Sequence, residues 1–156
     1  MFTHTLTVRF RDLDAMDHVN NATYLTYLEE TRLGFSSEMG INWARFREEG
    51  FVIARCEIDY RRPALLGDTL NIELWAGDIG RSSFEFQYRI TRPSDGQIIA
   101  EAKTVQVCYD AVRNRPIRLP ERWSLCLARH HNGPANVSAT GSGADLGLES
   151  ADQAAV

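Results

Sequence analysis

Four consecutive runs of alternating apolar and polar residues constrain the fold of this chain more than any other feature. In three of them, over residues 52–60, 70–76 and 84–90, apolar residues occupy every second position, and a longer, less regular run covers 98–110. A period of two is typical of a β-strand with one covered face and one face in solvent. The alternation therefore predicts antiparallel strands rather than a parallel sheet buried on both faces.

One long helical pattern precedes these runs. Apolar residues at helical spacing extend from Tyr24 to Met39, and Gly40 is a typical stop signal, so we expect a helix of about five turns. The apolar face of the sheet has to be covered, and this is the one long helix available for that. The pattern therefore predicts an α+β fold in which an antiparallel sheet wraps around one long central helix.

The two ends of the chain are less regular. A run over 5–10 alternates and predicts a first strand with Phe10 on its covered face, and 119–128 predicts a short helix. Beyond this helix the chain is rich in Gly, Ala, Ser and Asn and has little periodicity, which is typical of a flexible tail. We expect one domain over 1–130 and a tail over 131–156.

Composition and charge exclude several classes of protein. The formal net charge of -4, with both signs interspersed, argues against a general nucleic-acid or membrane-surface binder. No apolar run approaches the length of a membrane span, and the first residues lack the pattern of a signal peptide, so we expect a cytoplasmic protein.

Cys56, Cys108 and Cys126 are odd in number and widely spaced, which predicts reduced, largely buried thiols. No cluster has the spacing of a metal site, so we expect none.

The segment "RDLDAMDHVNNATYL", residues 11–25, places many polar side chains directly before the predicted helix. Asp17, Asn20 and Asn21 are good helix caps, but capping needs only one or two such residues. A helix start also presents free backbone N–H groups and the positive end of the helix dipole, which can hold a carbonyl oxygen that becomes negative during attack. A carboxylate beside it can attack the carbonyl carbon or activate a water molecule. This layout suits acyl hydrolysis.

The longer segment "DLDAMDHVNNATYLTYLEETR" resembles the signature of hotdog-fold acyl-CoA thioesterases in the 4-hydroxybenzoyl-CoA thioesterase-like family. The pattern D-x-D, H-V-N-N-x-x-Y, E-E-x-R is most similar to the long-chain acyl-CoA branch and is also similar to plant-type acyl-carrier-protein thioesterases. "RRPALLGDTL" and "GRSSFEFQYRI" match in register, so the resemblance covers about residues 5–128. It implies a hotdog fold and a homodimer, often a homotetramer, with active sites at the subunit interface.

The resemblance also implies roles for particular residues. Asp14 matches the catalytic carboxylate of the family, and Asn21 matches the position whose backbone N–H meets the thioester carbonyl. His18 matches a histidine implicated in the carrier-protein branch, and His18, Asn20 or both are expected to orient the carboxylate or the water. Met16 stands where the carrier-protein branch usually has an asparagine, which counts against a complete carrier-protein type of triad.

Coenzyme A carries several phosphates, and arginine binds phosphate with a bidentate fork. Arg81 matches a basic position in the coenzyme-contacting turn of the family, where Ser82 and Ser83 can add hydroxyl hydrogen bonds. Arg61 and Arg62 are weaker candidates at a strand end, and solvated strand ends remain the alternative for all three arginines. The resemblance implies no cofactor other than the coenzyme A of the substrate itself.

Two acidic residues of the predicted helix are alternative candidates. A separate hotdog branch uses a helix glutamate as its catalytic acid, and Glu29 or Glu30 lies in a comparable region. We favour surface pairing instead, such as Glu29 with Arg32 one helical turn later, because Asp14 already fits the catalytic role.

The predicted function is therefore an acyl-CoA thioesterase that hydrolyses an acyl-CoA thioester to a free acid and coenzyme A. Asp14 would act as nucleophile or as general base, and both routes need the same carboxylate in the same place. The alternatives are an acyl-carrier-protein thioesterase and a non-enzymatic acyl-binding hotdog protein, since fold alone does not establish catalysis. The expected partners are an acyl-CoA substrate and further copies of the chain, with no nucleic acid and no membrane.

Overall fold

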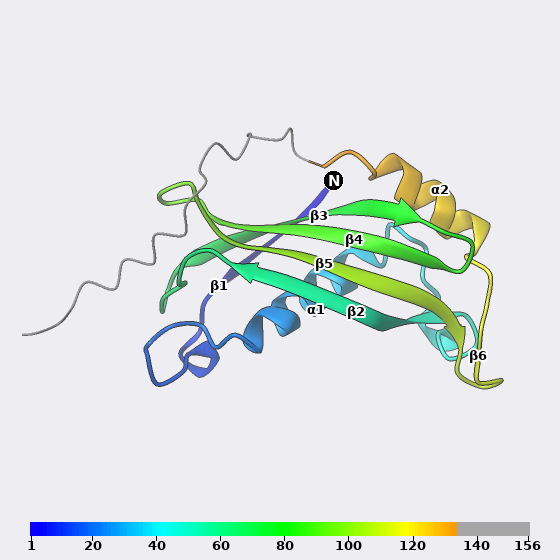
Figure 1. The fold of residues 1–156 in the computed structure, drawn as a ribbon, viewed down its shortest axis with the longest axis horizontal. Helices are drawn as coiled ribbons and strands as arrows, with labels where there is room; N and C mark the ends of the chain where they lie inside the picture. Colours follow the sequence, from blue (N-terminus) through cyan, green and yellow to red (C-terminus); the bar gives the residue numbers. More distant parts are fainter. Residues whose placement is uncertain (134–156) are drawn as a thin grey trace, which may run out of the picture.

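A computed structural model describes residues 1–133 of the chain. The order of elements is strand, helix, four strands, a two-residue strand and a second helix (Figure 1). The strands and α-helices are β1 (Phe2–Thr7), α1 (Thr23–Phe35), β2 (Gly50–Tyr60), β3 (Thr69–Ile79), β4 (Ser83–Arg92), β5 (Gln97–Asp110), β6 (Arg115–Pro116) and α2 (Glu121–Arg129). Two short 3₁₀ helices, η1 (Phe10–Asp12) and η2 (Trp43–Arg45), lie in the connections.

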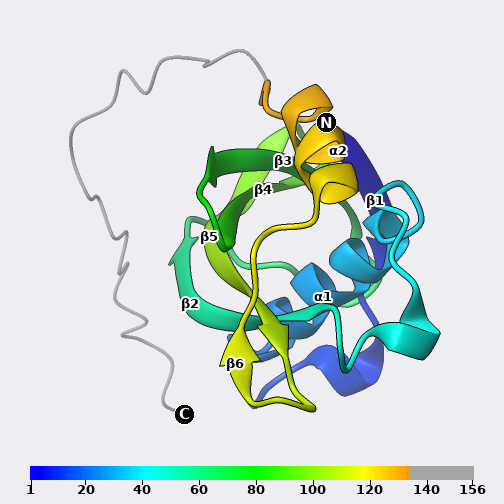
Figure 2. The same ribbon diagram turned by 90° about the vertical axis from the view of Figure 1, so that its right-hand side faces the viewer.

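The strands form one antiparallel sheet in the order β1-β3-β4-β5-β2, with β6 paired to β5. The view along α1 in Figure 2 shows that the sheet curls around this helix, while α2 lies at the end of the sheet near β3. This arrangement confirms the predicted α+β fold, a sheet wrapped around one central helix.

The core lies between α1 and the concave face of the sheet. The runs over β3, β4 and β5 alternate as predicted, with buried side chains at every second position. Tyr24, Tyr27 and Phe35 of α1 are buried and belong to this core. The largest side chains without solvent exposure in this core include Leu28, Leu70, Ile72, Leu74, Phe84, Phe86, Tyr88, Ile90 and Trp123.

The prediction that β2 has one covered face is wrong for the single chain. Residues 52–57 are all exposed, on both faces of the strand, although β2 pairs with β5 along its length. The physical reason is position: β2 is the last strand of the sheet, and a register shift between Ile53 and Arg55 bends it. Its outer edge has no partner strand within residues 1–133.

The predicted helix is too long. Helical structure in α1 ends at Phe35, and turns continue the chain to Gly40, which adopts a left-handed φ of 64°. The hydroxyls of Ser36 and Ser37 donate to the carbonyl oxygens of Leu33 and Gly34 one turn back. Such local bonds compete with the helical pattern, and apolar spacing does not reveal them.

The first strand is also displaced from its prediction. β1 ends at Thr7, and Phe10 lies in η1 with 80% of its surface exposed rather than on the covered face. The chain turns here because the carboxylate of Asp12 accepts hydrogen bonds from the backbone N–H and the side chain of Arg9. This local contact ends the strand pattern.

The predicted short helix is confirmed as α2, which starts after Pro120 and buries Trp123. The chain then remains in contact with the domain. The carbonyl oxygen of His130 accepts from the backbone N–H of Ala76, and Gly133 lies against the ring of Trp75. Residues 134–156, most of the predicted tail, lie outside the described residues.

The three cysteines are free. Cys108 and Cys126 are buried as expected, and burial raises the pKa of the Cys108 thiol to about 12. Cys56 is exposed, contrary to the prediction, because it lies on the uncovered strand β2. Among residues 1–133, no helix is both long enough and apolar enough to cross a membrane.

Candidate active site

A closed loop before α1 holds Asp14 in place. Its backbone N–H donates to the carbonyl oxygen of His18 over 2.8 Å, and its Oδ1 accepts from the backbone N–H of Met16 over 2.8 Å. Asp17, at the tip of the loop, takes a left-handed φ of 58°, a conformation that Asp and Asn tolerate better than most residues. The carboxylate of Asp14 is thus fixed by one oxygen, and the structure records no hydrogen bond from residues 1–133 to its Oδ2.

The connection between β2 and β3 supports this loop from the side. The backbone N–H of Val19 donates to the carbonyl oxygen of Ala64 over 2.9 Å, and His18 forms an isolated bridge with Leu65. Segments far apart in the sequence therefore hold the loop in one conformation. A fixed carboxylate is what catalysis on a positioned carbonyl group requires.

The turn before α1 leaves the backbone N–H of Asn21 without a recorded acceptor within residues 1–133. Asn20 closes the turn before α1, since its Oδ1 accepts from Ala22 N–H and its carbonyl oxygen accepts from Thr23 N–H, both over 2.9 Å. The carbonyl oxygen of Asn21 accepts from the hydroxyl of Tyr60 over 2.9 Å, which orients the peptide between Asn21 and Ala22 from the side of β2. The N–H of Asn21 donates to no acceptor within residues 1–133, so it is free for a ligand.

Asp12 anchors the same region from below. It is buried, with 4% of its surface exposed, and it accepts hydrogen bonds from Arg9 and from the hydroxyl of Tyr27 over 2.8 Å. Burial alone would raise the pKa of Asp12, but the bonds from the Arg9 backbone, the Tyr27 hydroxyl and the Arg9 side chain together hold its pKa below the usual value. Asp12 is a structural carboxylate that faces the core rather than the site.

An open hollow connects the predicted catalytic residues. It is lined by Asp14, His18, Val19, Asn21, Tyr24, Tyr60, Arg61, Arg62 and Pro63. The structure therefore brings Asp14, His18 and Asn21 together with two of the predicted arginines, whereas Asn20 closes the turn before α1 and is not among the lining residues. Burial raises the pKa of Tyr24 to about 12, so its phenol stays protonated at neutral pH and cannot serve as a base.

The other predicted coenzyme residues lie elsewhere. Arg81 belongs to the turn between β3 and β4, at the opposite end of the sheet from Asp14, and Ser82 and Ser83 follow it. Arg81 lines a second hollow with Arg118 and Ser124, next to the start of α2. Arg118 was not predicted from the sequence. The only sequence signal for it is a basic residue two positions before Pro120, which precedes α2.

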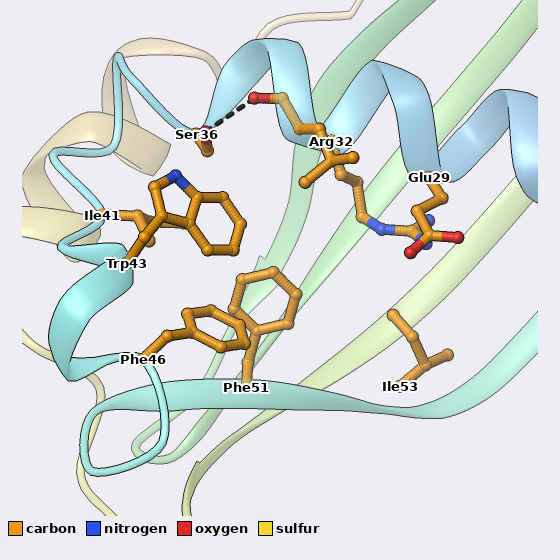
Figure 3. Close-up of a pocket in the computed structure, with 9 residues that line it drawn as sticks. Glu29, Arg32, Ser36, Ile41, Trp43, Phe46, Phe51 and Ile53 are labelled. Carbon is orange, nitrogen blue, oxygen red and sulfur yellow. Dashed lines mark hydrogen bonds between the residues drawn. The ribbon is translucent and has the colours of Figure 1, made fainter.

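A third hollow lies between the second half of α1 and β2. Figure 3 shows Trp43, Phe46 and Phe51 gathered at one end of it and Glu29 with Ile53 at the other. The predicted pair of Glu29 with Arg32 is not among the ion pairs of residues 1–133. Arg32 instead donates to the hydroxyl of Tyr88 over 3.2 Å, and Glu30 pairs with Arg9 over 3.5 Å.

No group of three or more His, Cys, Asp or Glu side chains within residues 1–133 lies close enough to hold a metal ion. What the fold and the hollow at the helix start define is a hotdog-fold protein in which a fixed carboxylate and a residue with a free backbone N–H line one hollow.

Comparison with known proteins leads to the same class. Residues 8–125 match the model of the Thioesterase-like superfamily, and the chain belongs to this family. It is 35% identical over 113 residues to the long-chain acyl-CoA thioesterase FadM of Escherichia coli, covering 72% of this chain and 86% of that protein. It is also 35% identical over 119 residues to the 1,4-dihydroxy-2-naphthoyl-CoA hydrolase of Synechococcus elongatus, covering 74% of this chain and 86% of that protein.

A solved structure of a thioesterase from Thermus thermophilus, in complex with coenzyme A and zinc, is similar as well. The two chains are 35% identical and superpose with a TM-score of 0.71, over 80% of this chain and 95% of the other. The likeness therefore extends over nearly the whole described domain.

Proposed function

We propose that this protein is an acyl-CoA thioesterase that hydrolyses an acyl-CoA to a free acid and coenzyme A. The observation that carries the proposal is the pairing of a fixed carboxylate, Asp14, with the free backbone N–H of Asn21 in one hollow. The two relatives that act on coenzyme A thioesters, FadM and the naphthoyl-CoA hydrolase, support this choice of substrate.

The proposed chemistry follows from these two groups. The N–H of Asn21, at the positive end of α1, donates a hydrogen bond to the thioester oxygen and stabilises the negative charge that develops on it. Asp14 uses its free oxygen either to attack the carbonyl carbon or to take a proton from an attacking water molecule. His18 lines the same hollow and is placed to orient the carboxylate or the water.

The distance between the two proposed sites supports a role for a second copy of the chain. β3 runs from the Asp14 end of the sheet to the Arg81 end, and its ten steps correspond to roughly 33 Å. A strand pairing in which β2 meets β2 of another copy in antiparallel orientation reverses one sheet relative to the other. Val107 of β5 pairs with Val52 of β2 on one side and with Ser83 of β4 on the other, so the Val52 end of β2 is the end nearest Ser83. In the antiparallel pairing this end meets the Tyr60 end of the other copy.

We therefore propose a homodimer in which each Asp14 works with Arg81, Ser82, Ser83 and Arg118 of the partner copy. The open edge and exposed faces of β2 support this arrangement, because an unpaired edge strand is a template for further pairing. Arg81 and Arg118 would hold coenzyme A phosphates, while Arg61 and Arg62 lie beside the thioester. No further cofactor is required, and the three free cysteines fit a cytoplasmic location.

Asp14→Asn tests the proposal, because it keeps the size of the side chain and removes its charge. The kcat for thiol release from acyl-CoA should fall by roughly 10²- to 10⁴-fold, as expected for the loss of a general base or nucleophile. Asp17→Asn is the matched control: it removes the same charge from the same loop, and Asn tolerates the left-handed conformation found there. Asp14→Asn with the thiol release of the parent protein would refute the proposed chemistry, and an acyl-binding protein would become the better description.

A further inference from the structure

Three hollows follow one another along α1 and β2. The first contains Asn21 and Tyr60, a second is lined by residues that include Leu25, Thr26, Cys56 and Thr104, and the third ends at Trp43 and Phe46. Glu29, Arg32 and Ile53 line both the second and the third. The second and third together form a trough between the helix and the edge strand, and the first hollow, with the proposed thioester position, lies beyond its Leu25 end.

Most of this trough is apolar, but two charged groups interrupt it. Glu29 and Arg32 lie one helical turn apart on the face of α1 that borders the trough, and the side chain of Arg32 extends back along the helix toward Glu29 (Figure 3). Their charged atoms are too far apart to count among the ion pairs of residues 1–133. Each group therefore keeps hydrogen-bonding capacity for a third partner.

The sheet holds Arg32 in position from below. Nη1 of Arg32 donates to the hydroxyl of the buried Tyr88 over 3.2 Å, and that hydroxyl lies 3.1 Å from the hydroxyl oxygen of Thr104. A guanidinium group has five N–H donors, and Tyr88 is its single recorded partner within residues 1–133. The remaining donors are available to whatever occupies the trough.

An unsubstituted alkyl chain is a poor ligand for the part of the trough beside Glu29 and Arg32. It would displace water from Glu29 and Arg32 and offer no hydrogen bond in return, which is costly for charged groups. A hydroxyl group has both functions that the pair needs, since its oxygen accepts from Arg32 and its hydrogen is donated to Glu29. A carboxylate would meet repulsion from Glu29. Neutral hydroxyl is thus the substituent that fits both groups.

The distance from the reacting carbon indicates where this hydroxyl sits. Glu29 follows Thr23, the first residue of α1, by six residues, which corresponds to about 9 Å along the helix axis, and Asn21 lies two residues before Thr23. We propose that Glu29 and Arg32 are specificity-determining residues that select acyl groups with a hydroxyl at the far end of a medium-length chain. This inference rests on the proposed function, which it deepens by naming the class of acyl group.

The test compares ω-hydroxyacyl-CoA with the unsubstituted acyl-CoA of equal length, in a series from octanoyl to tetradecanoyl that brackets this distance. The parent protein should show a higher kcat/KM for the hydroxylated member at one length, by roughly 10- to 100-fold, as expected for a hydrogen bond to a charged group. Arg32→Met should abolish this preference, and Arg32→Lys should retain part of it. Arg129→Met, which removes the same charge on α2 away from the trough, should leave the preference unchanged.

Two results overturn the inference: equal kcat/KM for both substrates at every length, or a preference that survives Arg32→Met. If Arg32→Met does not fold, the same test uses Glu29→Met, because Glu29 is exposed. Calorimetric binding of the same pairs to Asp14→Asn separates this inference from the proposed function. If the hydroxylated acyl-CoA binds more tightly but the parent protein hydrolyses neither substrate, only the proposed thioesterase activity is refuted. If the parent protein hydrolyses both substrates equally well, only the proposed preference for hydroxylated acyl groups is refuted.

Discussion

Asp12 and Asp14 lie two residues apart, and the backbone gives them different environments. Asp12 faces the core and accepts three hydrogen bonds, whereas Asp14 faces a hollow and has one oxygen without a recorded partner within residues 1–133. The D-x-D pattern alone does not distinguish them. Their difference depends on η1, which turns one carboxylate inward, and on the loop that holds the other at the surface.

The buried carboxylate should matter for stability. The three bonds from Arg9 and Tyr27 all end on Oδ2 of Asp12, so Asp12→Asn can keep an acceptor oxygen there but removes the negative charge that strengthens these bonds. We expect the free energy of unfolding to fall by about 1–3 kcal/mol, measured by urea denaturation. Asp17→Asn, an exposed change in the neighbouring loop, should leave it nearly unchanged. Equal stability of the Asp12→Asn and Asp17→Asn proteins would show that the carboxylate of Asp12 is dispensable for folding.

His130 should make stability depend on pH. Its Nδ1 accepts from the terminal ammonium group of Met1 over 3.1 Å, and its Nε2 lies 3.0 Å from the carboxylate of Glu38. Burial first, then the positive charge of Met1, lower the pKa of His130, although Glu38 opposes them. Below a pH of about 6.5 the unfolded chain therefore binds a proton here that the folded chain does not, and acid favours unfolding.

The melting temperature of the parent protein should accordingly decrease between about pH 7 and pH 5. His130→Gln should reduce this decrease, because it removes the titrating group. His131→Gln changes the exposed neighbouring histidine and should behave like the parent protein. The same slope of melting temperature against pH in the parent and His130→Gln proteins would exclude His130 as its source.

At the scale of elements, the predictions succeeded where side chains face a single environment. β3, β4 and β5 lie under α1 on one face, and their alternation appears directly in the sequence. The end of α1 was misplaced because hydroxyl groups of Ser36 and Ser37 replace helical bonding. β2 carries the same alternation as its neighbours, but as the edge strand it has no cover within the described chain.

β2 provides a direct test of the proposed dimer. Val52 is 46% exposed, and in the proposed pairing Val52→Asp would bring a new negative charge into the contact from each copy. Sedimentation velocity should show a shift from dimer toward the 17.6 kDa monomer, with a loss of activity at the same concentrations. Val112→Asp makes the same change at an exposed site between β5 and β6 and should leave the dimer intact. A parent protein that is monomeric at micromolar concentration would contradict the arrangement.

At the scale of the whole molecule, the sequence could predict which residues form the site but not how its parts meet. Asp14, His18 and Asn21 are close in sequence, so one loop brings them together. Arg81 was predicted to bind the coenzyme, and strand direction places it at the other end of the sheet from Asp14. The alternation of residues along the chain does not tell which strand ends lie at the same end of the sheet. Arg118 was missed for the same reason, since only folding brings it to Arg81.

The extent of the folded domain can be tested by truncation. A chain that ends at Gly133 should keep the melting temperature and activity of the full chain, because it retains every contact of residues 1–133. A chain that ends at Arg129 loses the bond from Ala76 N–H to His130 and the contacts of His130 with Glu38 and Phe35. Its melting temperature should be several degrees lower in calorimetry. A large loss in the chain that ends at Gly133 would show that residues 134–156 contribute to the domain.

The contact between Met1 and His130 means that the backbone of the domain is almost a closed ring. A short linker from Gly133 to Met1 would complete this ring without crossing the sheet or the proposed active site. New termini could then be opened in the turn between β4 and β5, where Gly96 has a left-handed φ of 68° and adding a Cβ would meet no atom within 4 Å. Folding rates of such circular permutants would report which strand pairings have to form first, because the permutation changes the order of the strands along the chain and keeps their contacts.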